Sequence, residues 1–492
     1  MKNKLIYFLL SFVLFTVSCD NENVPEETDS DDTNGTIKPM DNESKITYEL
    51  DDESNLKNPY MGWTLYAEGI SNAYTYWTLQ KEAAERYAST FYIRCSWSSL
   101  ETEEGTYAWV SDENFKALVQ GALDNGLRLA FRVVVDSRDG STDAVPEYVL
   151  QEGNYFTENG RKTPYPNNPY FLEKYTKFIE AFGKAFNDPS KVDYIDCAGI
   201  GKWGEEHTFK WQSTESGGLS EYETYKTISE AYAKAFDKVI NITNYQAGRT
   251  TTVDNFLYND MDFSLRRDGY VSSYFPPSAQ AAMVEYFPGK VIVAEACYWH
   301  TEPQSGTDKT QWKGWQDYYV RLVDLALETH ANYLDMRTTT ETSRLLQDNR
   351  DDVKRFVSQG GYRIYPKRIA ANIKDSKIAL DHTWQNVGVG VLPNNNKNLK
   401  FKYKVSFALF NESNEMVQQW YSDKIEVSEL VGNKQISGQE TFDMESLPAG
   451  TYKLGVGIVN TLPNDSKDIK LAIKRPNIIQ DEWVYICDVE YK

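Results

Sequence analysis

The sequence predicts an α/β chain in which a (β/α)8 TIM barrel is followed by a C-terminal antiparallel β-sandwich. Between residues 61 and 337, short apolar or β-branched runs alternate with segments of helical period, as in parallel strands joined by helices. Beyond about residue 365 the helical period disappears, and alternating runs separated by polar turns follow, as in stacked antiparallel sheets. An open doubly wound sheet is the alternative for the first region.

Residues 1–18 have the features of a signal peptide. Lys2 and Lys4 precede the apolar run LIYFLLSFVLF, which is too short for a comfortable membrane span and ends in TVSC. This pattern resembles a bacterial lipoprotein signal, with Cys19 as the lipidated first residue of the mature chain, although Thr16 stands where leucine is usual. A simple cleaved secretory signal is the alternative. The lipoprotein interpretation predicts a lipid anchor in the outer membrane of a Gram-negative cell envelope, with display at the cell surface as one arrangement.

Residues 19–45 form an acidic segment with almost no large apolar side chains. Such a segment cannot bury enough apolar surface to offset the entropy of ordering, so we expect a flexible tether. The net charge of the whole chain is -20, which argues against a nucleic-acid partner because phosphate contacts need a basic surface. The sequence identifies no protein partner.

Residues 46–365 carry the predicted barrel. Its eight strands are expected at residues 61–67, 89–97, 127–136, 192–201, 245–252, 268–274, 290–299 and 332–337. Helical segments such as YFLEKYTKFIEAFGKAF and GWQDYYVRLVDLALETH lie between most of them. Residues 366–492 follow as the β-sandwich, with turns such as PNNNKN and LPNDSKD between its strands.

Catalytic side chains of a barrel stand at the C-terminal ends of its strands. The polar or aromatic residues in these positions are Arg94, Trp97, Asp136, Glu205 or Glu206, Glu295, Asp335 and Arg337. Glu205 and Glu295 follow the fourth and seventh predicted strands, which lie roughly across the barrel mouth from each other. The two carboxylates are therefore expected to face one substrate.

The segments around these residues resemble retaining TIM-barrel glycoside hydrolases of the β-galactosidase-like clan. YIRCSWSSLETEEGTYAW (92–109) is similar to a stretch that follows the second strand in that clan, with Thr102 in place of the usual proline. WGEEH (203–207) and NPYMGW (58–63) resemble segments of a poorly characterised group of glycosidase-like bacterial lipoproteins with an appended β-sandwich.

The resemblance implies that Glu205 is the acid/base and Glu295 the nucleophile. Two departures from the family pattern stand beside them, since Gly204 replaces the usual asparagine and Glu206 stands where tryptophan is usual. If Glu206 were the acid, Glu205 would be a solvated loop residue.

Glycoside hydrolysis needs one carboxyl to protonate the leaving oxygen and a second carboxylate beside the anomeric carbon. Glu295 lies in the apolar run VIVAEACYW, where an unpaired charge is costly. It is therefore either catalytic or part of a structural ion pair with an arginine such as Arg94 or Arg337.

Candidate sugar-binding residues surround the two glutamates. Aromatic rings stack on the apolar faces of sugars while polar groups hold the hydroxyls. The candidates are Trp63, Arg94, Trp97, Asp136, Trp203, Glu206, His207, Tyr298, Trp299, His300, Asp335 and Arg337. Asp268 is a secondary candidate, as a substrate contact or as a salt-bridge partner. With four histidines and no C-x-x-C pair, neither a metal nor a cofactor is predicted.

The stretch AGIGKWGEEHTF (198–209) matches the G-x-G-x-x-G dinucleotide fingerprint. That motif requires a helix to begin on its last glycine, whereas polar, aromatic and glycine-rich residues follow here. The glycines fit a tight strand end better. The predicted function is an exported hydrolase of a poly- or oligosaccharide with a retaining two-glutamate mechanism. The alternative is a surface lipoprotein that binds glycans without cleaving them.

Overall fold

The computed structural model describes residues 43–492 except 247, 298–313 and 464. The predicted signal peptide, Cys19 and all but the last three residues of the predicted tether lie outside the described residues, as do Tyr298, Trp299 and His300. Within the described residues, no helix is long and apolar enough to cross a bilayer.

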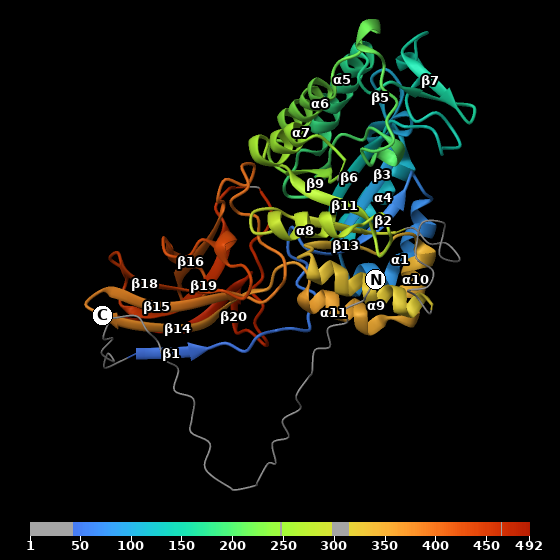
Figure 1. Ribbon diagram of the computed structural model, residues 1–492. Helices are drawn as coiled ribbons and strands as arrows, with labels where there is room; N and C mark the ends of the chain where they lie inside the picture. The colour runs from blue at the N-terminus through green and yellow to red at the C-terminus, as the bar shows by residue number, and fades with distance from the viewer. Residues whose placement is uncertain (1–42, 247, 298–313, 464) are drawn as a thin grey trace, which may run out of the picture. The chain divides into compact units, whose positions relative to one another are not determined.

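Eight parallel strands close into a barrel (Figure 1), which confirms the predicted TIM-barrel architecture. In barrel order they are β2 (Gly62–Glu68), β3 (Ala88–Ser96), β6 (Arg128–Val134), β9 (Val192–Asp196), β10 (Ile240–Asn244), β11 (Ser264–Tyr270), β12 (Ile292–Ala296) and β13 (Tyr333–Asp335). The fourth and seventh of these are β9 and β12. The open doubly wound alternative is excluded because β13 pairs with β2 and closes the sheet.

Two strands begin earlier than predicted. The fifth was expected at residues 245–252, but β10 ends at Asn244 and α7 (Thr251–Asn255) occupies the end of that segment. The reason is that α6 ends at Ala235, which frees the β-branched run that follows Phe236 to form the strand. The sixth was expected at residues 268–274, whereas β11 begins at Ser264 and has its buried part before Asp268.

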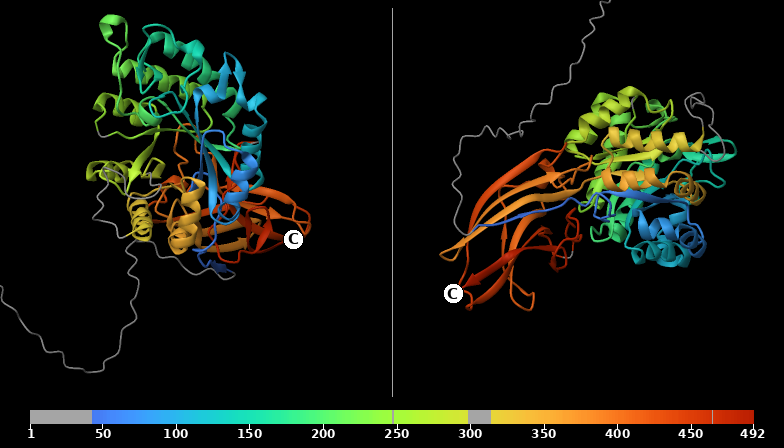
Figure 2. Two further views of the ribbon diagram at one scale, coloured as in Figure 1. Left: turned by 90° about the vertical axis from the view of Figure 1, so that its right-hand side faces the viewer. Right: turned by 90° about the horizontal axis from the view of Figure 1, so that it is seen from below.

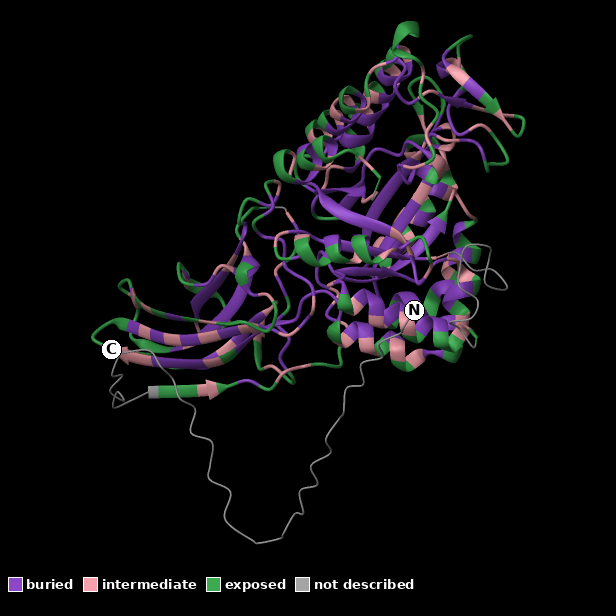
Figure 3. Ribbon diagram, in the orientation of Figure 1, coloured by how far each residue is buried: buried purple, intermediate pink, exposed green. Residues whose placement is uncertain are grey.

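Helices surround the barrel and turn their buried faces toward it (Figures 2 and 3). The longer ones are α1 (Ala73–Arg86), α4 (Glu113–Asp124), α5 (Pro169–Phe186), α6 (Glu221–Ala235), α8 (Pro277–Tyr286), α9 (Trp315–Glu328), α10 (Thr339–Asp348) and α11 (Arg350–Gln359). Their starts follow local chemistry. Asn168 caps α5 with proline at its first position, and Ser220 with Glu223 forms a capping box on α6.

Short elements lie in the loops between these strands and helices. They are α2 (Trp97–Leu100), β4 (Glu101–Glu103), β5 (Thr106–Tyr107), α3 (Ala108–Ser111), η1 (Glu147–Val149), β7 (Tyr155–Glu158), β8 (Arg161–Pro164), η2 (Lys202–Gly204), η3 (Thr214–Ser216) and η4 (Phe256–Asp260). The turn η2, directly before Glu205, is the one that matters most for the site.

The C-terminal region consists of two antiparallel sheets. One sheet has the order β1 (Glu43–Thr47), β14 (Ile364–Lys374), β15 (Lys377–Asn386) and β18 (Gln435–Asp443). The other has the order β17 (Met416–Tyr421), β16 (Tyr403–Phe410), β19 (Gly450–Asn460), β21 (Trp483–Tyr491) and β20 (Ile478–Gln480), with η5 (Val427–Glu429) between β17 and β18. Strand β1 pairs antiparallel with β14, so residues 43–47 belong to this region and not to a tether (19–45) or the barrel (46–365).

The barrel interior holds a layer of four tyrosines, which we call the tyrosine layer. Its members are Tyr66, Tyr92, Tyr194 and Tyr333, with neighbouring ring centroids 5.1–6.2 Å apart. They belong to a buried cluster that continues through Tyr60 and Tyr362 into the core of the C-terminal sheets. A separate cluster fills the space between the strands and the helices.

Candidate active site

A group of charged side chains lies at the C-terminal ends of the strands, beyond the tyrosine layer. We call it the charged layer; its members are Arg94, Arg132, Asp196, Arg266 and Glu295, from β3, β6, β9, β11 and β12. Parallel register places Arg94 beside Arg132 and Arg132 beside Asp196. Arg132 donates from Nε to Asp196 Oδ2 at 2.7 Å, and Tyr92 donates its hydroxyl to the same oxygen at 2.8 Å.

Glu295 is buried near the end of β12 and both of its carboxylate oxygens meet guanidinium groups. Arg266 contacts Oε2, and Arg337 contacts Oε1. Of the two arginines that the sequence offered as ion-pair partners, Arg337 is one, whereas Arg94 donates to the Tyr66 hydroxyl at 2.8 Å instead. Glu295 is therefore held with a fixed orientation in a positively charged pocket.

Glu205 stands directly after η2, in a tight turn that follows β9. Trp203, Gly204 and Glu206 all have left-handed backbone conformations there. At Gly199, an added Cβ would lie 1.9 Å from the Val133 carbonyl oxygen, so the glycine lets this loop approach β6 closely. The glycines therefore shape a strand end that brings Glu205 to the barrel mouth, as the sequence predicts.

Three basic groups surround the Glu205 carboxylate. Its Oε1 lies 3.6 Å from Arg94 Nη1 and 3.5 Å from Arg132 Nη1, and its Oε2 lies 3.6 Å from His207 Nε2. Burial by itself would raise the pKa of Glu205, but His207, Arg94 and Arg132 together hold it well below its usual range. Glu205 is therefore ionised in the resting site.

One chain of ion pairs joins the two glutamates across the barrel. Arg132 contacts both Glu205 and Asp196, and Arg266 contacts both Asp196 and Glu295. The carboxylates after the fourth and seventh strands thus belong to one connected site. Arg132, Arg266 and Asp196 were not predicted, although each is a charged residue inside an otherwise apolar strand, which is the signal that would have identified them.

Glu206 has different surroundings. Its Oε2 accepts from Arg249 Nη1 at 2.6 Å and its Oε1 accepts from the Asn244 backbone at 2.8 Å. Its side chain has no exposed surface, whereas Glu205 retains 7% exposure beside His207 with 28%. Burial raises the pKa of Glu206 to about 7, against the opposing effect of Arg249. Of the adjacent pair, Glu205 is the one whose side chain keeps exposed surface.

Asp268 and Asp335 are carboxyls near the ends of β11 and β13; Asp335 is buried, whereas the side chain of Asp268 is 18% exposed. Burial and the negative charge of Glu205 raise the pKa of Asp268, with Arg267 acting against them. Asp335 Oδ1 accepts from the Ala296 backbone at 2.8 Å, and burial raises its pKa to about 6 despite Arg337. Both groups therefore hold protons more tightly than exposed aspartates do.

Several predicted contacts occupy other positions. Trp63 and Trp97 are fully buried, donating from Nε1 to the Val353 carbonyl and to Glu101 respectively. They are core residues, and the prediction that they contact a sugar is wrong. Asp136 accepts from Arg138 Nε at Oδ1 and from Arg138 Nη2 at Oδ2, which makes a bidentate pair two residues apart.

Trp203 is 40% exposed and its ring packs edge-on against His207. Farther along the same loop, Trp211 is 36% exposed and packs on Phe209. This loop thus places exposed aromatic surface beside Glu205, at Trp203. The predicted contacts Tyr298, Trp299 and His300 lie outside the described residues.

Glu205, His207 and Asp268 are the one set in the described part of the chain whose side chains converge as metal ligands do, with ligand atoms within 4.8 Å of one another. Arg94 and Arg132 already face the Glu205 carboxylate, and Arg267 contacts that of Asp268. These guanidinium groups neutralise the oxygens that a cation would need. The group fits proton transfer better than metal binding.

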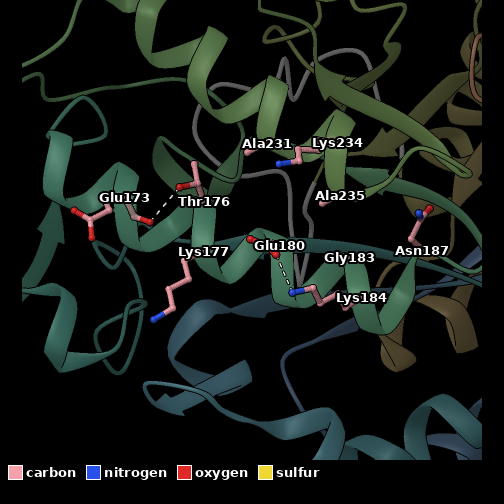
Figure 4. A pocket seen from close by; sticks show the side chains of 10 residues that line it. All are labelled: Glu173, Thr176, Lys177, Glu180, Gly183, Lys184, Asn187, Ala231, Lys234 and Ala235. Carbon is pink, nitrogen blue, oxygen red and sulfur yellow. Dashed lines mark hydrogen bonds and ion pairs between the residues drawn. The ribbon is translucent and has the colours of Figure 1, made fainter.

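A hollow of about 540 Å³ lies away from this site, between α5 and α6 (Figure 4). Its lining includes Gly183 and Ala235, and the charged groups around it include the pair Glu180–Lys184 at 2.8 Å. None of the residues that line it belongs to the charged layer.

No protein-family model matches the chain, and no curated protein matches it in sequence. Solved structures that it resembles include TIM-barrel glycoside hydrolases. A glycoside hydrolase family 5 enzyme from Prevotella bryantii B14 is 14% identical, with 63% of this chain and 98% of that chain covered at a TM-score of 0.40. An endo-1,4-beta-xylanase from Caldicellulosiruptor owensensis is 9% identical, with 57% of this chain and 87% of that chain covered at a TM-score of 0.37. Endo-glycoceramidase II from Rhodococcus sp. is 12% identical, with 82% of this chain and 100% of that chain covered at a TM-score of 0.40. At these identities the likeness concerns the fold alone.

Proposed function

We propose that this chain is an exported glycoside hydrolase that cleaves a poly- or oligosaccharide by a retaining mechanism, with Glu205 as acid/base and Glu295 as nucleophile. The observation that carries the proposal is the chain of ion pairs that links these two carboxylates at the mouth of the barrel. Catalytic groups of (β/α)8 enzymes lie at this end of the strands. We further propose a lipid anchor at Cys19 in the outer membrane, as in the glycosidase-like lipoproteins that the sequence resembles.

The reaction begins when a proton from the Glu205 side of the site moves to the glycosidic oxygen. The bond from that oxygen to C1 breaks, and an oxygen of Glu295 forms a bond to C1. Arg266 and Arg337 keep Glu295 ionised and aimed, and one of them must give up its contact as the carboxylate attacks. Water then adds to C1 and passes its proton back to Glu205, and the bond to Glu295 breaks.

Substrate contacts would come from the partly exposed groups around Glu205. Arg94 and His207 are positioned to hold hydroxyl groups, and the ring of Trp203 offers a flat apolar face to a sugar. No cofactor is needed for this chemistry.

A second candidate is a glycan-binding lipoprotein that has lost the reaction. It is favoured by the contacts of Glu295, since both oxygens are already engaged by guanidinium groups. A carboxylate in that position also serves to close a barrel.

Substitutions of the two glutamates separate these candidates. Glu295→Gln and Glu205→Gln are compared with wild type on a panel of aryl glycosides and polysaccharides. We expect kcat to fall by about 10⁴-fold or more in Glu295→Gln, as for other covalent nucleophiles, with glycan binding retained. The anomeric configuration of the released sugar, followed by NMR, tests retention.

Asp139→Asn is the matched control, because Asp139 pairs with Lys202 in the same region without contacting either glutamate. Absence of hydrolysis by the wild type on the whole panel, together with measurable glycan binding, would favour the second candidate.

A further inference from the structure

The proposed reaction leaves a second carboxyl beside Glu205 without a role. Asp268 follows Arg267 on β11, and one of its carboxyl oxygens lies within 4.8 Å of a carboxyl oxygen of Glu205. Asn244 holds both residues in place, because its Nδ2 donates to the Glu205 backbone carbonyl at 2.8 Å and to Asp268 Oδ1 at 3.0 Å. Asn244 is itself fully buried on β10. The close approach of the two carboxyls is therefore built by three separate segments of the barrel.

A proton on one of two neighbouring carboxyl groups lets that group donate to the other, because ionised carboxylates have acceptors only. Two carboxylates that lie this close also disfavour each other's ionisation. Both effects favour one proton in the pair.

The surrounding charges decide which member of the pair is ionised. The titratable and charged groups that face the pair are Arg94 from β3, Arg132 from β6, Asp196 from β9, His207 from the loop after β9, Arg267 from β11 and Cys297 after β12. Two guanidinium groups and the imidazole lie against Glu205, whereas one guanidinium contacts Asp268. Glu205 is accordingly the ionised member, and Asp268 holds the proton.

We propose that Asp268 and Glu205 share one proton and work as a single acid, in which Asp268 is the positioning residue that keeps the proton available to Glu205. This inference rests on the proposed function. During cleavage the shared proton moves to the glycosidic oxygen, and the pair is left with two negative charges that Arg94, Arg132 and Arg267 face. During hydrolysis of the bond to Glu295, the attacking water returns a proton to the pair.

The sharing is tested first without any substrate, by infrared spectroscopy of protonated carboxyl groups as a function of pH. We expect a band in the wild type that is missing from Asp268→Asn and that titrates at lower pH in Glu205→Gln, because removal of the neighbouring charge makes Asp268 easier to ionise. A band that Asp268→Asn leaves unchanged, or a midpoint that Glu205→Gln does not move, overturns the proposal. Asp139→Asn is the control, and thermal unfolding of each variant checks that it is folded.

The role in the reaction is tested with two aryl glycosides that differ in leaving group. A dinitrophenyl group leaves without protonation, whereas a phenyl group needs the acid. Asp268→Asn is expected to lower kcat/KM for the phenyl glycoside by about 10²–10⁴-fold, which is the usual contribution of a general acid. The kcat/KM for the dinitrophenyl glycoside is expected to change little. The alkaline limb of the pH profile moves to lower pH, since Glu205 without its partner remains ionised.

An equal loss on both substrates with an unchanged pH profile would mean that Asp268 only supports the structure, while hydrolysis by Glu205 and Glu295 stands. If the wild type hydrolyses neither substrate but the infrared band behaves as expected, the proposed function fails and the shared proton stands without it.

Discussion

Glu206 is a buried carboxyl in this site whose ionisation is expected to affect the stability of the fold. Burial raises its pKa to about 7, from an ordinary value of 4.5. Between these values the folded chain retains a proton that the unfolded chain has lost, so the free energy of unfolding falls as the pH rises from about 4.5 to about 7. The full contribution is about 3 kcal/mol, and it is present below pH 4.5 and lost above pH 7.

Urea unfolding of Glu206→Gln and wild type across this pH range measures that effect. The stability of the variant relative to wild type is expected to rise by about 3 kcal/mol between the two pH values, because glutamine does not titrate. Glu158→Gln serves as the control, since Glu158 pairs with Lys210 in an exposed position and its relative stability should be flat above pH 5. A flat difference for Glu206→Gln as well would show that this carboxyl ionises normally in the fold.

The tyrosine layer offers a matched pair of hydroxyl deletions. Tyr92 donates to Asp196 Oδ2 at 2.8 Å, whereas the Tyr194 hydroxyl has no hydrogen-bond partner among the described residues. Tyr92→Phe is expected to destabilise the fold by about 1–3 kcal/mol, because a buried charged acceptor loses a donor. Tyr194→Phe is expected to be neutral or stabilising, since no bond is lost. Chemical denaturation compares them, and equal losses would contradict the assigned partners.

The packing of α5 on α6 depends on a single glycine. At Gly183, an added Cβ would lie 2.4 Å from the Ala235 carbonyl oxygen and 2.7 Å from its Cβ. Alanine is a better helix former than glycine by about 1 kcal/mol. However, an added Cβ would meet the backbone of Ala235, which cannot move without the rest of α6. We expect Gly183→Ala to destabilise by about 1–3 kcal/mol, as overpacked cores do. Glu180→Ala, on the exposed side of α5, is the control, and a net gain in Tm for Gly183→Ala would show that the helices separate freely.

The strands and helices were largely predictable because apolar periodicity follows from which face each element buries. Strands β9 and β12 could be placed by that rule. Their positions in turn predict that Glu205 and Glu295 lie at the C-terminal ends of barrel strands. The fifth strand could not, because the helical period of α6 runs on without a break signal into Ile240. Strand β1 was missed for another reason, since its pairing partner β14 lies more than 300 residues away.

The contacts of the site were harder to predict than its position. Which arginine meets Glu295 depends on three-dimensional register, and Arg266 lies on a strand whose start was misplaced. The separate environments of Glu205 and Glu206 follow from the left-handed backbone of Trp203, Gly204 and Glu206, which periodicity does not reveal.

The barrel and the C-terminal sheets share buried contacts at the barrel floor. Asn58, which is 1% exposed, donates to the Lys470 carbonyl and accepts from the Lys470 backbone, both at 2.9 Å. Lys402 is also buried and reaches the Tyr60 hydroxyl at 3.3 Å as well as Asp465. Because the apolar cluster of the barrel interior continues through the same region, the two regions share part of their core. The two are therefore expected to unfold together.

Asn58→Ala tests this cooperativity. It leaves the N–H and the carbonyl of Lys470 without partners, at a cost of about 2–4 kcal/mol. Differential scanning calorimetry is expected to show one transition in wild type and one in the variant, shifted as a whole to lower temperature. Asn259→Ala is the control, because its amide bonds only to the exposed Asn255 side chain and its loss should cost no more than about 0.5 kcal/mol. Two transitions, of which Asn58→Ala shifts only one, would show that the barrel and the sheets are independent folding units. In a single cooperative unit, a substitution between the two regions lowers the stability of both together.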